Sequence, residues 1–167
     1  MARINTAFAC SLFIAAIVAA NMSVAFFGPM VTPINAFLLI GLDLSLRDAL
    51  HDRWANDGIV WRMGALILAG SAISFMVNPA TGMIAIASCV SFGASSAADA
   101  LTYGMIRKRP FMVRANGSNL VGAGVDSILF PAIAFGALMP HIVLMQFAAK
   151  VAGGFVWSLA LRKAARV

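Results

Sequence analysis

The chain consists of long apolar runs separated by short polar breaks. Breaks fall at Gly28-Pro29, Asn78-Pro79 and Met139-Pro140, where glycine or proline disfavours a continuous helix, and at two charged stretches between them. A run of about 20 apolar residues is long enough to cross the hydrocarbon core of a bilayer as an α-helix. The pattern therefore predicts about six membrane-spanning helices. We expect them at residues 5–24, 31–42, 60–77, 81–106, 116–138 and 141–161.

The second of these spans has a short apolar part. Beyond Leu42 the sequence becomes charged, from Asp43 to Asp57. We expect a helix that leaves the membrane with a solvated face of mixed charge. The charged and titratable residues on the outer part of that helix are Arg47, Asp48, His51, Asp52, Arg53 and Asp57.

The overall composition excludes an ordinary soluble domain. Hydrophobic residues make up 62% of the 167 residues and charged residues only 11%, whereas soluble domains have about 45–50% apolar and about 25% charged residues. This much apolar side chain is expected to face lipid. The spans would use about 120 residues, so we expect one transmembrane domain, residues 1–167, in the cell (inner) membrane. No soluble catalytic domain is expected.

The basic residues indicate an orientation. If the N-terminus is cytoplasmic, all but one of the 12 Lys and Arg residues fall on the cytoplasmic side, and the three outer turns carry none. Cytoplasmic loops of membrane proteins are enriched in Lys and Arg, so both termini are predicted to be cytoplasmic. The net charge of +6 is then explained by topology. The lipid bilayer is the expected partner, and nucleic acid is not.

The exception among the basic residues, Lys150, falls near the middle of the last span, and Asp126 falls near the middle of the span before it. Each is about 15 Å deep in an apolar core about 30 Å thick. Consecutive antiparallel helices would bring the two side chains together, so that each charge offsets the desolvation of the other. We predict an Asp126–Lys150 ion pair. Because charges at this depth are costly, we interpret the pair as functional rather than only structural.

Other polar residues recur at helical spacing, which places them on one face of each helix. Asp43 and Arg47, four residues apart, are expected to pair. Hydroxyl residues on one face are also typical of close helix packing, but Asp99 at the end of such a face favours a wet cavity. Together the polar faces predict a solute cavity inside a helix bundle. They comprise Asn35, Asp43 and Arg47; Ser88, Ser91, Ser95, Asp99 and Thr102; Ser118, Gly122 and Asp126, with Asn119 nearby; and Gln146, Lys150, Gly153 and Trp157.

No enzymatic motif accompanies these residues. The sequence contains no H-E-x-x-H motif, no phosphate-cradling glycine loop and no metal-ligand spacing. Cys10 and Cys89 lie in apolar runs and are expected to be core residues. We therefore predict no enzymatic activity, no cofactor and no metal. Transport is favoured over a small membrane enzyme or a pore-forming protein.

Four short stretches, in order along the chain, carry a family resemblance. They are the apolar run from Phe37 that ends in Asp43-Leu44-Ser45-Leu46-Arg47; Asp99 ahead of a basic loop; the segment from Ser118 to Phe130, which contains Asp126-Ser127; and Lys150 in the last span. Together they resemble the queuosine precursor transporters, also called the vitamin uptake transporter family. The chain would be a compact member.

The resemblance implies import of a deazaguanine base, such as 7-cyano-7-deazaguanine, into the cytoplasm. It also implies a six-helix fold similar to that of the substrate-binding subunits of energy-coupling-factor vitamin transporters. A subunit of that kind, which needs a partner ATPase module, is the alternative function. Small-residue faces at Gly64-Ala65, Gly70-Ser71 and Gly153-Gly154 would pack within the chain or between copies, which leaves a homo-oligomer open.

A deazaguanine base would suit the polar residues chemically. Asp126 or Asp43 would accept hydrogen bonds from the ring N–H and the exocyclic amine, and Phe130 or Trp157 would stack on the ring. The carbonyl side would face Lys150, Asn119, Gln146 or Asn21. The expected substrate-binding set is Asp126, Lys150, Asp43, Arg47, Asp99, Asn119, Ser118, Gln146 and Asn21.

Overall fold

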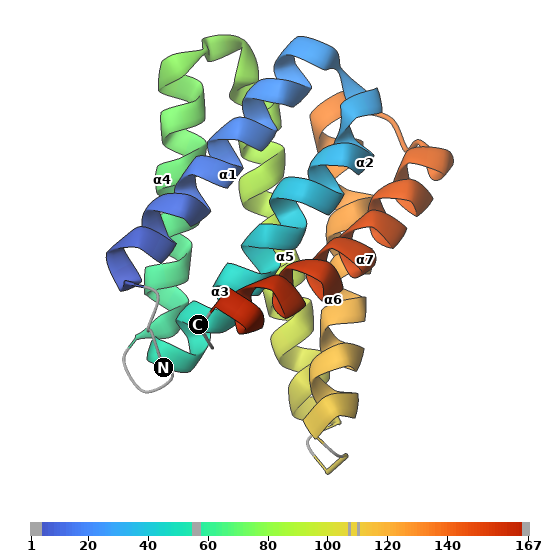
Figure 1. The fold of residues 1–167 in the computed structure, drawn as a ribbon. Helices are drawn as coiled ribbons and strands as arrows, with labels where there is room; N and C mark the ends of the chain where they lie inside the picture. The colour runs from blue at the N-terminus through green and yellow to red at the C-terminus, as the bar shows by residue number, and fades with distance from the viewer. Residues whose placement is uncertain (1–4, 55–57, 107, 110, 165–167) are drawn as a thin grey trace.

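The structure, a computed structural model, describes residues 5–54, 58–106, 108–109 and 111–164. The described residues form helices and contain no strand, which confirms the expected all-α class (Figure 1). The α-helices are α1 (Thr6–Phe27), α2 (Thr32–Asn35), α3 (Gly41–Trp54), α4 (Ile59–Val77), α5 (Gly82–Met105), α6 (Phe111–Phe135) and α7 (Pro140–Ala164). Three short segments, η1 (Pro29–Val31), η2 (Ala36–Ile40) and η3 (Pro79–Thr81), complete the described helical structure.

The helices end at the breaks that the sequence predicts. α1 ends at Gly28, whose φ of 72° is easily adopted only by glycine. After α4 the side chain of Asn78 accepts a hydrogen bond of 3.0 Å from the backbone N–H of Ala80, which starts the turn into α5. The basic run at 107–110 separates α5 from α6.

The second predicted span is one helical path from Thr32 to Trp54 that changes type in the middle. Its central segment, η2, is a π-helix over Ala36–Ile40. A π-turn inserts one extra residue into an α-helix and is frequent at functional sites. The sequence predicted the helix and its charged continuation but gave no signal for the π segment, which lies between Asn35 and Asp43.

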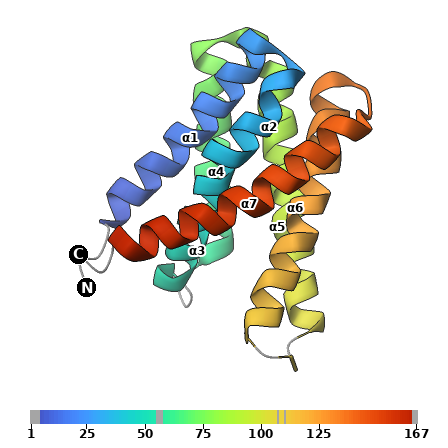
Figure 2. The same cartoon turned by 45° about the vertical axis from the view of Figure 1, so that its right-hand side comes forward.

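With α2, η2 and α3 counted as one helical path, successive helices run in alternating directions (Figure 1). The turns after α1, α4 and α6 lie at one end of the molecule, and the turn between α5 and α6 lies at the other (Figure 1). α7 runs obliquely across α2 and α3 (Figure 2).

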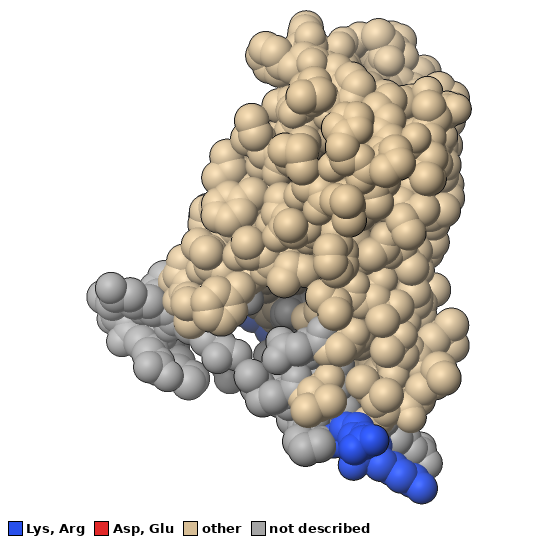
Figure 3. Space-filling model, turned by 90° about the vertical axis from the view of Figure 1, so that its right-hand side faces the viewer, with Lys and Arg blue, Asp and Glu red and all other residues tan. Residues whose placement is uncertain are grey.

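The outer surface of the bundle is apolar. Large side chains such as Phe26, Val60 and Met76 are exposed, and the described part of the face in Figure 3 shows charge only toward one end, where Lys and Arg lie. Within the described residues, five helical segments are long and apolar enough to cross a membrane. They are Thr6–Phe27, Pro29–Arg47, Val60–Val77, Pro79–Met105 and Gly117–Phe135.

These segments make the chain a multi-pass membrane protein. α7 is 25 residues long but is not one of the five, and it carries His141, Gln146 and Lys150. The sixth crossing therefore stays a prediction, and so does the cytoplasmic placement of the termini.

α7 is held against the second helix by a close backbone contact. A Cβ atom added at Gly153 would lie 2.9 Å from the Cα of Phe37 in η2, closer than such atoms come. This small-residue face therefore packs within the chain, and the contact fixes the part of α7 that carries Lys150 one turn earlier.

We predict that Gly153→Ala lowers the thermal midpoint of the purified protein in detergent. Overpacking of this kind costs about 1–3 kcal/mol. Gly64→Ala is the matched control, because a Cβ at Gly64 meets no atom within 4 Å. Alanine there is expected to stabilise the helix by about 0.5–1 kcal/mol. Equal midpoints for the two variants would contradict the proposed close contact.

Candidate functional site

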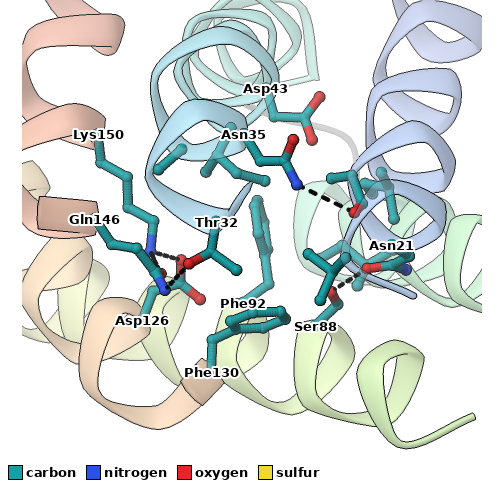
Figure 4. Close-up of a pocket in the computed structure, with 16 residues that line it drawn as sticks. Asn21, Thr32, Asn35, Asp43, Ser88, Phe92, Asp126, Phe130, Gln146 and Lys150 are labelled. Atoms are coloured by element: carbon teal, nitrogen blue, oxygen red, sulfur yellow. Dashed lines mark hydrogen bonds and ion pairs between the residues drawn. The ribbon is translucent and has the colours of Figure 1, made fainter. Parts of the chain in front are cut away.

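A pocket lies inside the helix bundle, among residues from all seven α-helices and η2 (Figure 4). It encloses about 580 Å³ of atom-free space, which includes space open to the outside. Its apolar lining comes from Ile17, Ala20, Val24, Ala36, Ile40, Ile67, Phe92 and Phe130. Its polar lining comes from Asn21, Thr32, Asn35, Asp43, Ser88, Asp126, Gln146 and Lys150.

The predicted Asp126–Lys150 ion pair is confirmed. The ammonium of Lys150 lies 2.7 Å from Asp126 Oδ2, and the two side chains are 3% and 14% exposed. The ammonium also donates to Ser127 Oγ at 3.1 Å and to Gln146 Oε1 at 3.4 Å. Its three protons therefore have three acceptors, and the pair is a compact, fully engaged cluster on the α6–α7 side of the pocket.

The ion pair is linked to the second helix through Gln146. The amide nitrogen of Gln146 donates to Thr32 Oγ at 3.0 Å, and the hydroxyl of Thr32 donates to the backbone oxygen of Pro29 at 2.7 Å. This chain of hydrogen bonds connects α6, α7 and the start of α2. It fixes the rotamer of Gln146 and leaves Lys150 little freedom.

A second polar group lies on the α1 side of the pocket (Figure 4). Asn21 donates to Ser74 Oγ at 3.1 Å and accepts from the hydroxyl of Ser88 at 2.6 Å. Asn35 donates to Ser23 Oγ at 2.6 Å. These bonds join α1 to α4, α5 and α2, and Asn21 is only 1% exposed. The pocket thus has two polar ends, with Phe92 and Phe130 between them.

Asp43 has no such partner. Its side chain is fully buried at 0% exposure, it lines the pocket, and neither carboxylate oxygen has a hydrogen-bond partner among the described residues. The expected pairing with Arg47 is wrong. Arg47 Nη2 instead donates to Asn119 Oδ1 of α6 at 2.9 Å. α6 supplies this guanidinium with an acceptor across the helix interface, and Asp43, a lining residue of the pocket, is left without that partner.

The structure brings together part of the predicted binding set. Asp126, Lys150, Asp43, Gln146 and Asn21 all line the pocket. Arg47, Asn119, Ser118 and Asp99 do not. Of the two aromatic residues considered for stacking, Phe130 lines the pocket, whereas Trp157 packs against the hydrophobic core around Phe13 and Leu46.

The polar face of α5 serves mainly in packing. The hydroxyl of Ser95 donates to the backbone oxygen of Gly122 at 2.9 Å, and a Cβ at Gly122 would lie 3.4 Å from the Cβ of Asp99. Ser88 is the one member of that face that lines the pocket. Ser95 and Asp99 therefore lie where α5 packs closely on α6. The sequence had instead favoured a wet cavity along this face.

Thr32 and Phe92 are among the lining residues that escaped the sequence analysis. Thr32 precedes Pro33 at the start of a helix, which is a turn signal rather than a ligand signal, and only its contact with Gln146 shows its place. Phe92 is one of many apolar residues in α5, and nothing in the spacing distinguishes it. Of the cluster formed by Arg47, Asp48, His51, Asp52, Arg53 and Asp57, Asp57 and the side chains of Asp48, His51 and Asp52 lie outside what the structure describes.

Comparison with known proteins gives one match. A family model described as "Putative vitamin uptake transporter" matches residues 2–161. No curated protein and no solved structure matches the chain. The matched range includes all four stretches on which the resemblance rests, and so it includes the ion pair and Asp43.

We predict that the ion pair behaves as a coupled unit in stability measurements. Asp126→Asn or Lys150→Met alone should cost about 3–5 kcal/mol, because each leaves a buried charge uncompensated. The double variant should recover much of that loss, seen as a higher thermal midpoint in detergent than either single variant. Lys108→Met, at an exposed position, is the control and should change little. Additive losses in the double variant would contradict the coupling.

Proposed function

The chain belongs to the vitamin uptake transporter family, and we propose that it imports a queuosine precursor into the cytoplasm. The substrate would be 7-cyano-7-deazaguanine or a related deazaguanine base. The observation that carries this proposal is the pocket inside the bundle, which holds a buried ion pair, a free carboxylate and two phenylalanine rings (Figure 4). Membership of a transporter family supports transport, and the pocket supports a small polar heterocycle as cargo.

The shape of the polar lining suits such a base. A deazaguanine is flat and aromatic, with hydrogen-bond donors and acceptors around its edge. Phe92 and Phe130 offer aromatic surface for its faces, while the polar groups lie at opposite ends of the pocket, where the edge of a base would meet them. We propose that the binding residues are Asp126, Lys150, Asp43, Gln146 and Asn21, all of which line the pocket.

We further propose a single domain with six crossings and both termini in the cytoplasm of the cell (inner) membrane. Five crossings correspond to the apolar helices, and α7 would be the sixth. The alternating helix directions (Figure 1) and the concentration of basic residues in the sequence at the predicted inner loops support this arrangement. Such a fold is similar to that implied by the resemblance to energy-coupling-factor substrate-binding subunits.

Transport is tested with proteoliposomes that contain only this chain. We expect time-dependent uptake of labelled 7-cyano-7-deazaguanine, blocked by an excess of the unlabelled base. Asp126→Asn and Lys150→Ala should each reduce uptake by about 10-fold or more, equivalent to at least about 1.4 kcal/mol. Lys108→Ala is the control. If both pocket variants transported like the wild type, the site assignment would be wrong. Folded wild-type protein that moved no deazapurine would contradict the proposed function.

Orientation is tested by labelling introduced cysteines from outside the cell, in a background with Cys10→Ser and Cys89→Ser. Ala80 and Arg109 are both exposed and lie at opposite ends of the bundle. We expect a membrane-impermeant maleimide to label Ala80→Cys in intact cells and Arg109→Cys only after permeabilisation. The reverse pattern would contradict cytoplasmic termini.

A further inference from the structure

We propose that Asp43, rather than Asp126, selects the ligand, by accepting two hydrogen bonds from a heterocycle that carries a ring N–H beside an exocyclic amine. This inference rests on the proposed transport function. It names the residue in the same pocket that binds the edge of the base carrying the ring N–H and the exocyclic amine.

The first argument is that only one of the two pocket carboxylates, that of Asp43, has no partner on either oxygen among the described residues. Asp126 is held by Lys150 at 2.7 Å, and Lys150 is held in turn by Ser127 and Gln146. A ligand that bound both oxygens of Asp126 would share Oδ2 with the Lys150 ammonium and weaken the compensation of that buried charge, which is costly. Asp126 and Lys150 therefore form a preorganised wall of the pocket.

The second argument is that Asp43 lacks partners for both of its oxygens. It is fully buried, and neither oxygen has a hydrogen-bond partner in the part of the chain that the structure describes. Buried polar groups in native proteins are nearly always hydrogen-bonded, so an exception calls for an explanation. The other charged residues nearby are engaged elsewhere: Asp126 and Lys150 with each other, and Arg47, one turn along α3, with Asn119.

The third argument concerns what satisfies two carboxylate oxygens at once. Two parallel N–H donors on neighbouring atoms match the two oxygens of a carboxylate, and charge-assisted pairs of this kind are strong and geometrically specific. A ring N–H next to an exocyclic amine provides such donors on one flat edge. Asp43 lies in the first turn of α3, shortly after the π-helical segment, and Figure 4 shows it on a different side of the pocket from the ion pair.

This arrangement would make the pocket selective. A base without the exocyclic amine leaves one oxygen of Asp43 unpaired, and a base with a carbonyl in its place sets oxygen against oxygen. Sites that hydrogen-bond a particular ligand group reject analogues lacking it, because the buried partner is left unpaired. The apolar lining of the pocket, which includes Ile40 and Ile67, offers no compensating donor.

The test compares three ligands that differ only at this edge: 7-deazaguanine, 7-deazahypoxanthine and 7-deazaxanthine. Equilibrium binding to the purified full chain should rank 7-deazaguanine first. The other two should bind about 10- to 100-fold more weakly, as expected for loss of a hydrogen bond to a buried charged group.

Asp43→Asn should reverse the preference. An asparagine amide of the same size offers one acceptor and one donor, which complement the ring N–H and the carbonyl of 7-deazaxanthine. That ligand should therefore bind the variant more tightly than 7-deazaguanine does. Substitution of a residue with only a structural role would not switch the preference from one ligand to another. Asp43→Ala is the second variant and should remove the advantage of 7-deazaguanine over 7-deazahypoxanthine.

The matched control is Asp99→Asn. Asp99 also has a buried carboxylate oxygen without a partner in the described residues, but it lies outside the pocket against α6. This variant should keep the wild-type ligand order. The thermal midpoint of each variant without ligand shows whether it folds, and both Asp43 variants should be at least as stable as the wild type, because each removes an unpartnered buried carboxylate.

The outcomes separate the two proposals. One outcome is that wild-type protein binds 7-deazaguanine while Asp43→Asn and Asp43→Ala keep the ligand order. In that case Asp43 does not bind the ring N–H and the exocyclic amine, and only the transport proposal stands. If Asp126→Asn reverses the order instead, Asp126 accepts the hydrogen bonds of the ring N–H and the exocyclic amine, and the inference is overturned. If folded wild-type protein binds none of the three bases, the proposed substrate class itself fails.

Discussion

A charged group inside a lipid-facing bundle is costly unless another charge compensates it, and the Asp126–Lys150 ion pair supplies that compensation where α6 and α7 meet. Other features of the structure depend on it. Gln146 and Ser127 complete the coordination of the ammonium, Gln146 reaches Thr32 at the start of α2, and Gly153 allows the backbone of α7 to approach η2. The pocket lies beside the pair, among residues from all seven α-helices and η2.

Asp43 shows what the same constraint leaves open. The bundle compensates one pocket carboxylate internally and leaves the other without a partner among the described residues. A protein built only for stability would avoid an unpartnered carboxylate at a fully buried position. A transporter benefits from one, because the ligand completes the hydrogen bonding that the empty pocket lacks. In this account the ion pair gives the pocket its shape, and Asp43 gives it chemical selectivity.

Much of the fold was predictable, because lipid as solvent makes the sequence pattern explicit. The breaks at Gly28-Pro29 and Asn78-Pro79 predicted the helix ends. The similar depth of Asp126 and Lys150 in consecutive spans predicted the ion pair. What could not be predicted depended on contacts between helices. The Arg47–Asn119 hydrogen bond replaced a plausible local pair with Asp43, since only the packed bundle brings α6 close enough. The π-helical segment has no periodicity signal of its own.

The most direct measurement of the central claim is an experimental structure of the chain with 7-cyano-7-deazaguanine bound. The account predicts the base inside the pocket, with its ring N–H and exocyclic amine on the carboxylate of Asp43, its ring beside Phe130, and the Asp126–Lys150 pair intact. A base bound outside this pocket, or one that separates Asp126 from Lys150 while Asp43 stays without a partner, would contradict it.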